Sequence, residues 1–295
     1  MSGLIAKSAV FHLFIGAFMI SFSPVFARLA GAATSATGFY RMVFGLVGLA
    51  ILFAVSSKVT RINRKGLFIT VASGVFFSFD IYFWHVSILY VGPGLSTLLA
   101  NFQVFFLAVI DVIVFKERVK LRLIIAIILA FSGLYLIAGN GWDGRDEQFR
   151  IGVIYGLLTA LMYTGYIYTL RMAGSQDNPV DKKLSMFILT GVSGVILGVT
   201  AIMSGESLVI SDLRTGIYLL AYGVLCQAFA WVIIASALPK VKLTISGLIL
   251  LLQPAFAYVW DVTIFSKDVT SIEFIGAILA LTGIYIGTIR RTPKS

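Results

Sequence analysis

Apolar residues run along the chain in long unbroken segments that are separated by short polar breaks. A helix needs about 20 apolar residues to cross the core of a bilayer. The runs lack the two-residue alternation of barrel strands, so the pattern predicts an all-α integral membrane protein with ten transmembrane helices. The ten segments are 8–27, 34–56, 66–90, 94–115, 120–138, 151–170, 184–204, 213–237, 243–265 and 271–289.

The composition agrees with a protein whose solvent is lipid. Hydrophobic residues make up 59% of the chain and charged residues 12%, whereas about a quarter of an ordinary soluble domain is charged. The net charge of +10 does not indicate nucleic acid as a partner, because the basic residues lie in the short breaks. The only cysteine, Cys226, lies inside an apolar run, so the sequence holds no disulfide framework.

The positive charges set the orientation. Of the 23 Lys and Arg residues, 17 fall on the side that holds both termini, 5 fall on the other side and Arg41 lies inside the second segment. This bias places both termini in the cytoplasm. The first segment is too long for a usual signal peptide, and Arg28 follows it directly. We therefore expect an uncleaved helix.

One stretch of the chain occurs twice. Residues 103–135 match residues 253–285 at an offset of 150, with 13 of 33 positions identical, including Gln103/Gln253 and Gly133/Gly283. The offset divides the chain into a first repeat (1–140), an extracytoplasmic linker (141–150) and a second repeat (151–295). Five spans per repeat is an odd number, so the second repeat would cross the membrane inverted. Inverted repeats are typical of alternating-access carriers.

Three features resemble the drug/metabolite transporter superfamily and its EamA-type ten-helix proteins. The fourth segment ends in Phe115-Lys116-Glu117-Arg118-Val119, a helix rich in small residues follows at 127–137, and both recur at 253–285 with Pro254 in the second copy. Val104 and Lys267-Asp268 depart from the usual motif. The resemblance covers essentially the whole chain. It implies solute transport, often export of amino acids or related metabolites, through a cavity lined by helices one, three, four, six, eight and nine.

Asp80 is the first candidate site residue, because it lies near the middle of the third segment. Ionisable groups inside a membrane helix are costly and tend to mark function or a buried pair. The functional interpretation is that Asp80 faces the cavity and binds a cationic group or a coupling proton. The alternative is a structural pair with Arg41 or His85.

Amides supply a second set of candidates. Asn101, Gln103 and Gln253 lie deep in their segments, and an amide offers both donors and acceptors to a zwitterion. Asp111 and Asp261 are also repeat positions, but each lies about one turn from a segment end, which favours a structural role for them.

Aromatic and proline residues complete the candidate site. Tyr163 on the sixth segment, and Gln227 with Trp231 on the eighth, would form an amphipathic wall for an organic solute, with simple packing as the alternative. Pro24 and Pro254 interrupt the first and ninth segments. Each removes a backbone donor and predicts a kink, either a hinge or a static bend.

The sequence Gly191-Val192-Ser193-Gly194 spells the GxSG of intramembrane serine proteases. A serine needs a base to become a nucleophile. The two histidines, His12 and His85, both precede Ser193, whereas rhomboid-type proteases place theirs after it. Close packing of the glycines is the favoured interpretation.

No motif indicates a cofactor. The sequence has neither a phosphate-binding loop nor a recognisable metal-ligand spacing. We therefore predict a non-enzymatic secondary active transporter of the bacterial inner membrane. It would export or exchange small organic metabolites such as amino acids, with possible proton coupling and lipid as its surroundings, and would act as a monomer. The rival functions are a passive channel or facilitator and, less favoured, an intramembrane protease.

Overall fold

The computed structural model describes residues 2–54, 63–115, 121–139, 146–174, 182–237, 249–250 and 252–288, and every regular element in these ranges is helical. Three predicted features lie partly or wholly outside the described residues. They are the motif residues Lys116 to Val119, the linker residues 141–145 and residues 243–248 of the ninth predicted segment. The helices are α1 (Ser2–Ser21), α2 (Ser23–Ala30), α3 (Thr34–Ala54), α4 (Arg64–Ala100), α5 (Gln103–Phe115), α6 (Leu121–Leu134), α7 (Glu147–Gly174), α8 (Lys182–Met203), α9 (Leu213–Ala221), α10 (Ala230–Ala237), α12 (Leu252–Phe265) and α13 (Ser271–Thr288), with π-helices η1 (Tyr135–Gly139) and η3 (Tyr222–Phe229).

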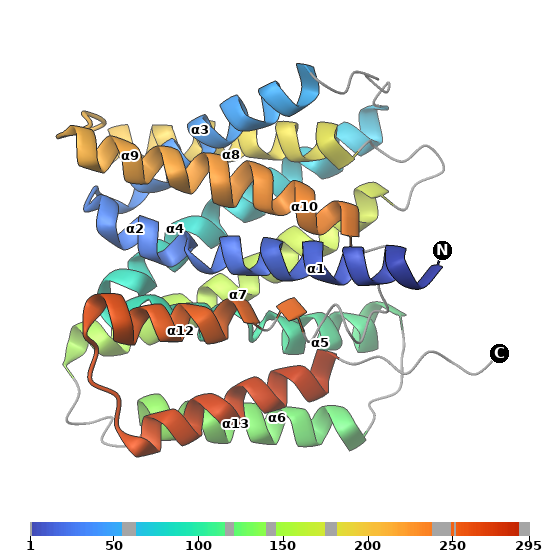
Figure 1. The fold of residues 1–295 in the computed structure, drawn as a ribbon, viewed down its shortest axis with the longest axis vertical. Helices are drawn as coiled ribbons and strands as arrows, with labels where there is room; N and C mark the ends of the chain where they lie inside the picture. The colour runs from blue at the N-terminus through green and yellow to red at the C-terminus, as the bar shows by residue number, and fades with distance from the viewer. Residues whose placement is uncertain are drawn as a thin grey trace.

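The helices lie roughly side by side and form a layered bundle (Figure 1). Six helical stretches of the described residues are long and apolar enough to cross a membrane, and α6–η1 and α13 contribute shorter apolar helices. The chain is therefore an all-helical, multi-pass membrane protein. The six stretches are Ser8–Ala30, Thr34–Ala54, Arg64–Leu107, Glu147–Leu170, Lys183–Met203 and Leu213–Ile234.

The first predicted helix contains a break. The first segment divides into α1 and α2 at Phe22. Pro24 lies in the first turn of α2, where backbone N–H groups have no partner within the helix. The N–H that proline lacks therefore costs α2 no hydrogen bond. The kink predicted at Pro24 is therefore present, as a junction between two helices. Pro254 also lies in a first turn, that of α12.

The break predicted at residues 91–94 is present inside α4, where two helices meet at a kink and Gly92 has a non-helical conformation. The fourth segment, predicted as one helix over 94–115, instead breaks at Asn101 and Phe102. The Asn101 side chain donates to the Thr97 carbonyl over 2.8 Å, and such a bond competes with the backbone ladder at the end of a helix.

Helices from the two halves of the chain pack against each other throughout the bundle. The most extensive contacts are those of α4 with α7, α6 with α13, α3 with α8, α3 with η3 and α4 with α8. Glycines allow the closest approaches. A Cβ atom on Gly45 would lie 2.6 Å from the Gln227 side chain, and one on Gly74 would lie 2.7 Å from Val192. These approaches bring the polar residues of α3, α4 and η3 together in the interior.

Candidate solute-binding site

Arg41 is the centre of a buried polar cluster between α3 and η3. Only 4% of the residue is exposed. Its Nε donates to Gln227 Oε1 over 2.9 Å, and its Nη1 donates to the Tyr222 hydroxyl over 2.8 Å. The guanidinium also lies 4.7 Å from the centre of the Tyr222 ring. Its other terminal nitrogen, Nη2, has no hydrogen-bond partner among the described residues.

The network extends from Arg41 to two further helices, α4 and α8. His85 on α4 makes a 2.9 Å hydrogen bond with the Tyr222 hydroxyl and a 3.2 Å bond with the Thr34 carbonyl. The Gln227 amide donates to Thr190 Oγ1 on α8 over 3.2 Å. Each hydrogen bond removes part of the desolvation cost of a buried polar group. Together they hold the Arg41 side chain in one position.

Asp80 lies near this cluster on α4. It is 6% exposed and within electrostatic range of Arg41, Tyr163 and Tyr166. No direct ion pair with Arg41 and no hydrogen bond to Asp80 occurs in the described part of the chain. Two ionisable side chains of opposite sign are therefore buried near each other without a direct bond between them.

Tyr163 and Tyr166 on α7 form an aromatic wall beside these charges. Their rings stack with centroids 5.8 Å apart, and Tyr166 lies 4.7 Å from the ring of Phe77 on α4. Arg41 lies 5.6 Å from the same Phe77 ring. A cation beside aromatic faces gains a further electrostatic attraction.

The structure brings together three of the seven predicted binding residues: Asp80, Tyr163 and Gln227. The other four make no described contact with the Arg41 cluster. Asn101 bonds to its own helix, and Gln103 at the start of α5 has a buried side-chain oxygen without a partner. Trp231 on α10 has a buried, unpartnered indole nitrogen, and Gln253 is half-buried at the start of α12.

Sequence reasoning missed Arg41, Tyr222 and Thr190 as members of the site. A signal for Arg41 was present, because it lies well inside a predicted segment, whereas the other Lys and Arg residues lie in the breaks or within three residues of a segment end. Tyr222 and Gln227 both lie in η3, and π-helical turns occur frequently at functional sites. Hydropathy does not reveal a π-helix.

Ser193 of the GxSG sequence is buried, and its hydroxyl donates to the Gly74 carbonyl on α4 over 2.8 Å. The His85 ring is bonded to Thr34 and Tyr222, and His12 is bonded to Ser8. The contacts of Ser193 are therefore those of helix packing. Among the described residues, no group of three or more His, Cys, Asp and Glu residues could hold a metal ion.

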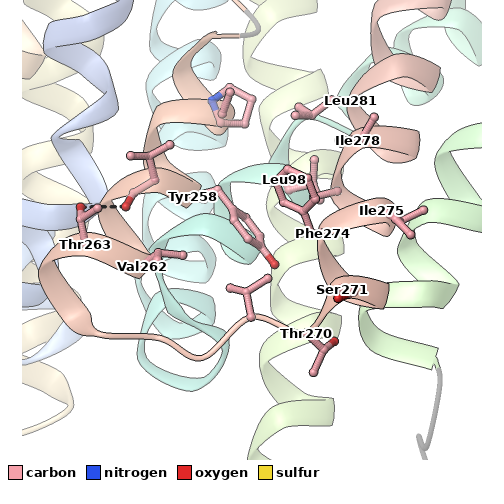
Figure 2. Close-up of a pocket in the computed structure, with 15 residues that line it drawn as sticks. Leu98, Tyr258, Val262, Thr263, Thr270, Ser271, Phe274, Ile275, Ile278 and Leu281 are labelled. Atoms are coloured by element: carbon pink, nitrogen blue, oxygen red, sulfur yellow. Dashed lines mark hydrogen bonds between the residues drawn. The ribbon is translucent and has the colours of Figure 1, made fainter.

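A separate apolar groove of about 760 Å³ lies between α12 and α13 (Figure 2). The Tyr258 ring and the side chains of Leu98, Phe274 and Ile278 line it, with Thr270 and Ser271 at one end. The Tyr258 hydroxyl has no partner in the structure. None of the residues that line the groove belongs to the Arg41 cluster.

Comparison with known proteins agrees with the fold. A solved crystal structure superposes with a TM-score of 0.66 at 15% identity, covering 96% of this chain and 98% of that one. An uncharacterized transporter of Bacillus subtilis, YxxF, is 22% identical over 84% of this chain and 78% of its own length. A protein of Escherichia coli named a probable amino-acid metabolite efflux pump is 24% identical over 65% of this chain and 66% of its own. An uncharacterized transporter of Archaeoglobus fulgidus is 23% identical over 92% of this chain and 93% of its own.

The model of the EamA-like transporter family matches residues 7–139 and again residues 150–289. The two matches fall on the two halves that the internal repeat defines, and together they cover most of the chain. The chain therefore belongs to the EamA-like transporter family.

Proposed function

We propose that this protein is a secondary active transporter that moves small organic metabolites such as amino acids by alternating access. The observation that carries the proposal is the pair of buried opposite charges, Arg41 and Asp80. A membrane protein that buries two charges without pairing them gives up stability. A zwitterionic solute offers both missing partners, a carboxylate for Arg41 Nη2 and an ammonium group for Asp80.

The other residues of the site have complementary roles in this proposal. Gln227 and Tyr222 orient the guanidinium, and Tyr163 provides an apolar face with a polar edge. Asn101, Gln103, Trp231 and Gln253 would line the route to the site, where the unpartnered atoms of Gln103 and Trp231 offer an acceptor and a donor. The name of the Escherichia coli relative supports an amino-acid-like solute and the direction of export or exchange.

The proposed architecture is ten spans in two inverted repeats, 1–140 and 151–295, joined by an extracytoplasmic linker at 141–150. Reciprocal packing of α6 on α13 supports it. A Cβ atom on Gly133 would lie 2.9 Å from the Cα atom of Ala280, and one on Gly283 would lie 2.9 Å from that of Ala130. Gly133/Gly283 and Ala130/Ala280 are repeat positions, so each contact is the two-fold counterpart of the other.

The remaining parts of the proposal concern the membrane location, the orientation, the coupling proton and the hinges. We place the protein in a bacterial inner membrane, as a monomer with both termini in the cytoplasm. Asp80 would carry a coupling proton when no solute ammonium occupies it, and Pro24 and Pro254 would lie at the hinges of the rocking motion.

Solute counterflow in proteoliposomes tests the transport function. A mixed panel of amino acids would be offered to the wild type, Asp80→Asn and Ser78→Ala, with and without a pH gradient. Ser78 is the matched control, because it is buried on the same helix as Asp80 and its hydroxyl donates to the Val75 carbonyl of that helix. We expect saturable flux that Asp80→Asn lowers at least about tenfold and that Ser78→Ala leaves unchanged.

The rival functions give different results in the same assay. A passive channel or facilitator would show flux without accumulation against a gradient. The protease interpretation requires peptide cleavage that Ser193→Ala abolishes. The absence of counterflow with every solute of the panel would overturn the carrier proposal.

A further inference from the structure

Asp261 is a fully buried carboxylate near the end of α12. That end of α12 lies across the bundle from the N-terminus of the chain (Figure 1). Asp261 Oδ1 accepts a hydrogen bond from Arg28 Nη1 on α2 over 3.2 Å. Its Oδ2 accepts one from the backbone N–H of Gly94 on α4 over 3.2 Å and lies 3.5 Å from Lys267 Nζ. One carboxylate therefore joins α12 and its following loop to two helices from the first half of the chain.

The break in α4 is built around this carboxylate. Gly92 has φ +83°, and a Cβ atom there would lie 2.6 Å from Asp261 Oδ2. No other residue fits this position without strain. Pro93 has no backbone donor, so Gly94 carries the first N–H after the break, and Asp261 accepts it in the manner of a helix cap. The conformation of α4 and the position of α12 therefore depend on each other.

The two cations cover the carboxylate on the side that faces solvent. The side chains of Arg28 and Lys267 are 40% and 25% exposed, whereas that of Asp261 is 0% exposed. Arg28 lies 4.2 Å from the centre of the Phe265 ring, and Lys267 Nζ also donates to the Val91 carbonyl over 3.3 Å. Both cations line a pocket of about 330 Å³ that also contains Asp268.

We infer that Arg28, Asp261 and Lys267 form the gate that closes the extracytoplasmic end of the transport pathway. The inference rests on the proposed alternating access and orientation. Separation of the two halves at this end must break the Arg28–Asp261 ion pair and the Gly94–Asp261 hydrogen bond together. Entry of water then weakens the attraction between the charges, so the gate has two discrete states, closed and dry or open and wet.

The single cysteine of the chain reports on this gate. Cys226 is buried in η3 beside Gln227, its thiol contacts the Met19 carbonyl, and it lies within electrostatic range of Arg41. Right-side-out membrane vesicles would be treated with a membrane-impermeant thiol reagent, and the rate of Cys226 labelling would be measured in the wild type, Asp261→Asn and Asp268→Asn. Asp268 is the matched control, an acid in the same pocket without a described contact to Arg28. The variant Cys226→Ser, which has no cysteine, gives the background rate of labelling.

We expect Asp261→Asn to accelerate labelling about tenfold, because it removes the charge that holds both cations, and Asp268→Asn to label at the wild-type rate. Arg28→Gln, which keeps the Gly94 bond, should have a smaller effect in the same direction and serves as the second variant should Asp261→Asn fail to fold. Equal rates in the wild type and in both gate variants would overturn the inference.

Counterflow of the same proteins separates the gate from the proposed function. Accelerated labelling without flux of any solute would retain the gate and overturn the transport proposal. Solute flux with unchanged labelling would retain the transport proposal and overturn the gate.

Discussion

Arg41 and Gln227 are 186 residues apart in the sequence, and a 2.9 Å hydrogen bond joins them in the interior of the bundle. Arg41 belongs to the first half of the chain and Gln227 to the second. The bond therefore forms only when α3 packs against η3, which requires Gly45 at the contact. The position of the buried cation depends on both halves.

Arg41→Lys should abolish most of the transport although it keeps the positive charge. A lysine presents one compact ammonium group and cannot donate to Gln227 and Tyr222 while leaving a free nitrogen for solute. We expect counterflow to fall at least about tenfold. Lys183→Arg, a substitution of the same kind on α8, should leave it unchanged. Wild-type flux in Arg41→Lys would show that charge alone suffices.

Gly133→Ala and Gly283→Ala should destabilise the protein by similar amounts. In each variant the added methyl group meets the backbone of the opposite helix, which cannot give way as a side chain can. Overpacking of this kind costs about 1–3 kcal/mol, which a thermal unfolding assay in detergent would detect. Gly191→Ala is the control, since a Cβ atom there meets nothing within 4 Å. A large loss in one glycine variant alone would argue against the two-fold relation.

Tyr258→Phe should leave stability unchanged or raise it slightly. The hydroxyl is buried and has no hydrogen-bond partner among the described residues, and removal of an unsatisfied polar group relieves its desolvation penalty. The melting temperature of the variant in nanodiscs compared with the wild type checks this. A clear decrease would reveal a hydrogen-bond partner for the hydroxyl in the assembled membrane.

Asp212 should stabilise α9 at neutral pH and lose this effect in acid. It caps the helix through a 2.9 Å bond from the Thr215 N–H, and this bond, with that from Ser211, lowers the pKa of the carboxyl below its usual 3.8. A depressed pKa means that the stabilisation is present above the unfolded pKa and is lost as pH falls through the folded value. The difference in melting temperature between the wild type and Asp212→Ala should therefore shrink below about pH 3.8. A constant difference down to pH 2 would contradict it.

The sequence predicted the long helices well because each is set by a local property. The second segment, predicted at 34–56, is α3 over Thr34–Ala54, and the seventh, predicted at 184–204, is α8 over Lys182–Met203. The break at Asn101 was missed because it depends on one side chain competing with the backbone of its own helix.

The site was predicted only in part, and the reason is packing. Asp80 stood out in the sequence because its charge is costly wherever it faces inside a membrane. The partners of Arg41 could not be read in advance, since Tyr222 and Gln227 reach it only through contacts between distant segments. Asp261 was expected to be structural, and its contact with Gly92 became visible only when α4 and α12 were placed together.

The reciprocal glycine contact between α6 and α13 also orders the biogenesis of the protein. Helix α6 is synthesised long before α13, so its surface around Gly133 faces lipid or another helix until the final described helix has been inserted. A nascent chain that stops before Ser271 leaves this surface uncovered. Insertion of α13 and burial of the Gly133 surface are thus the same event, and a membrane protease that recognises uncovered helices would distinguish chains that have inserted α13 from chains that have not.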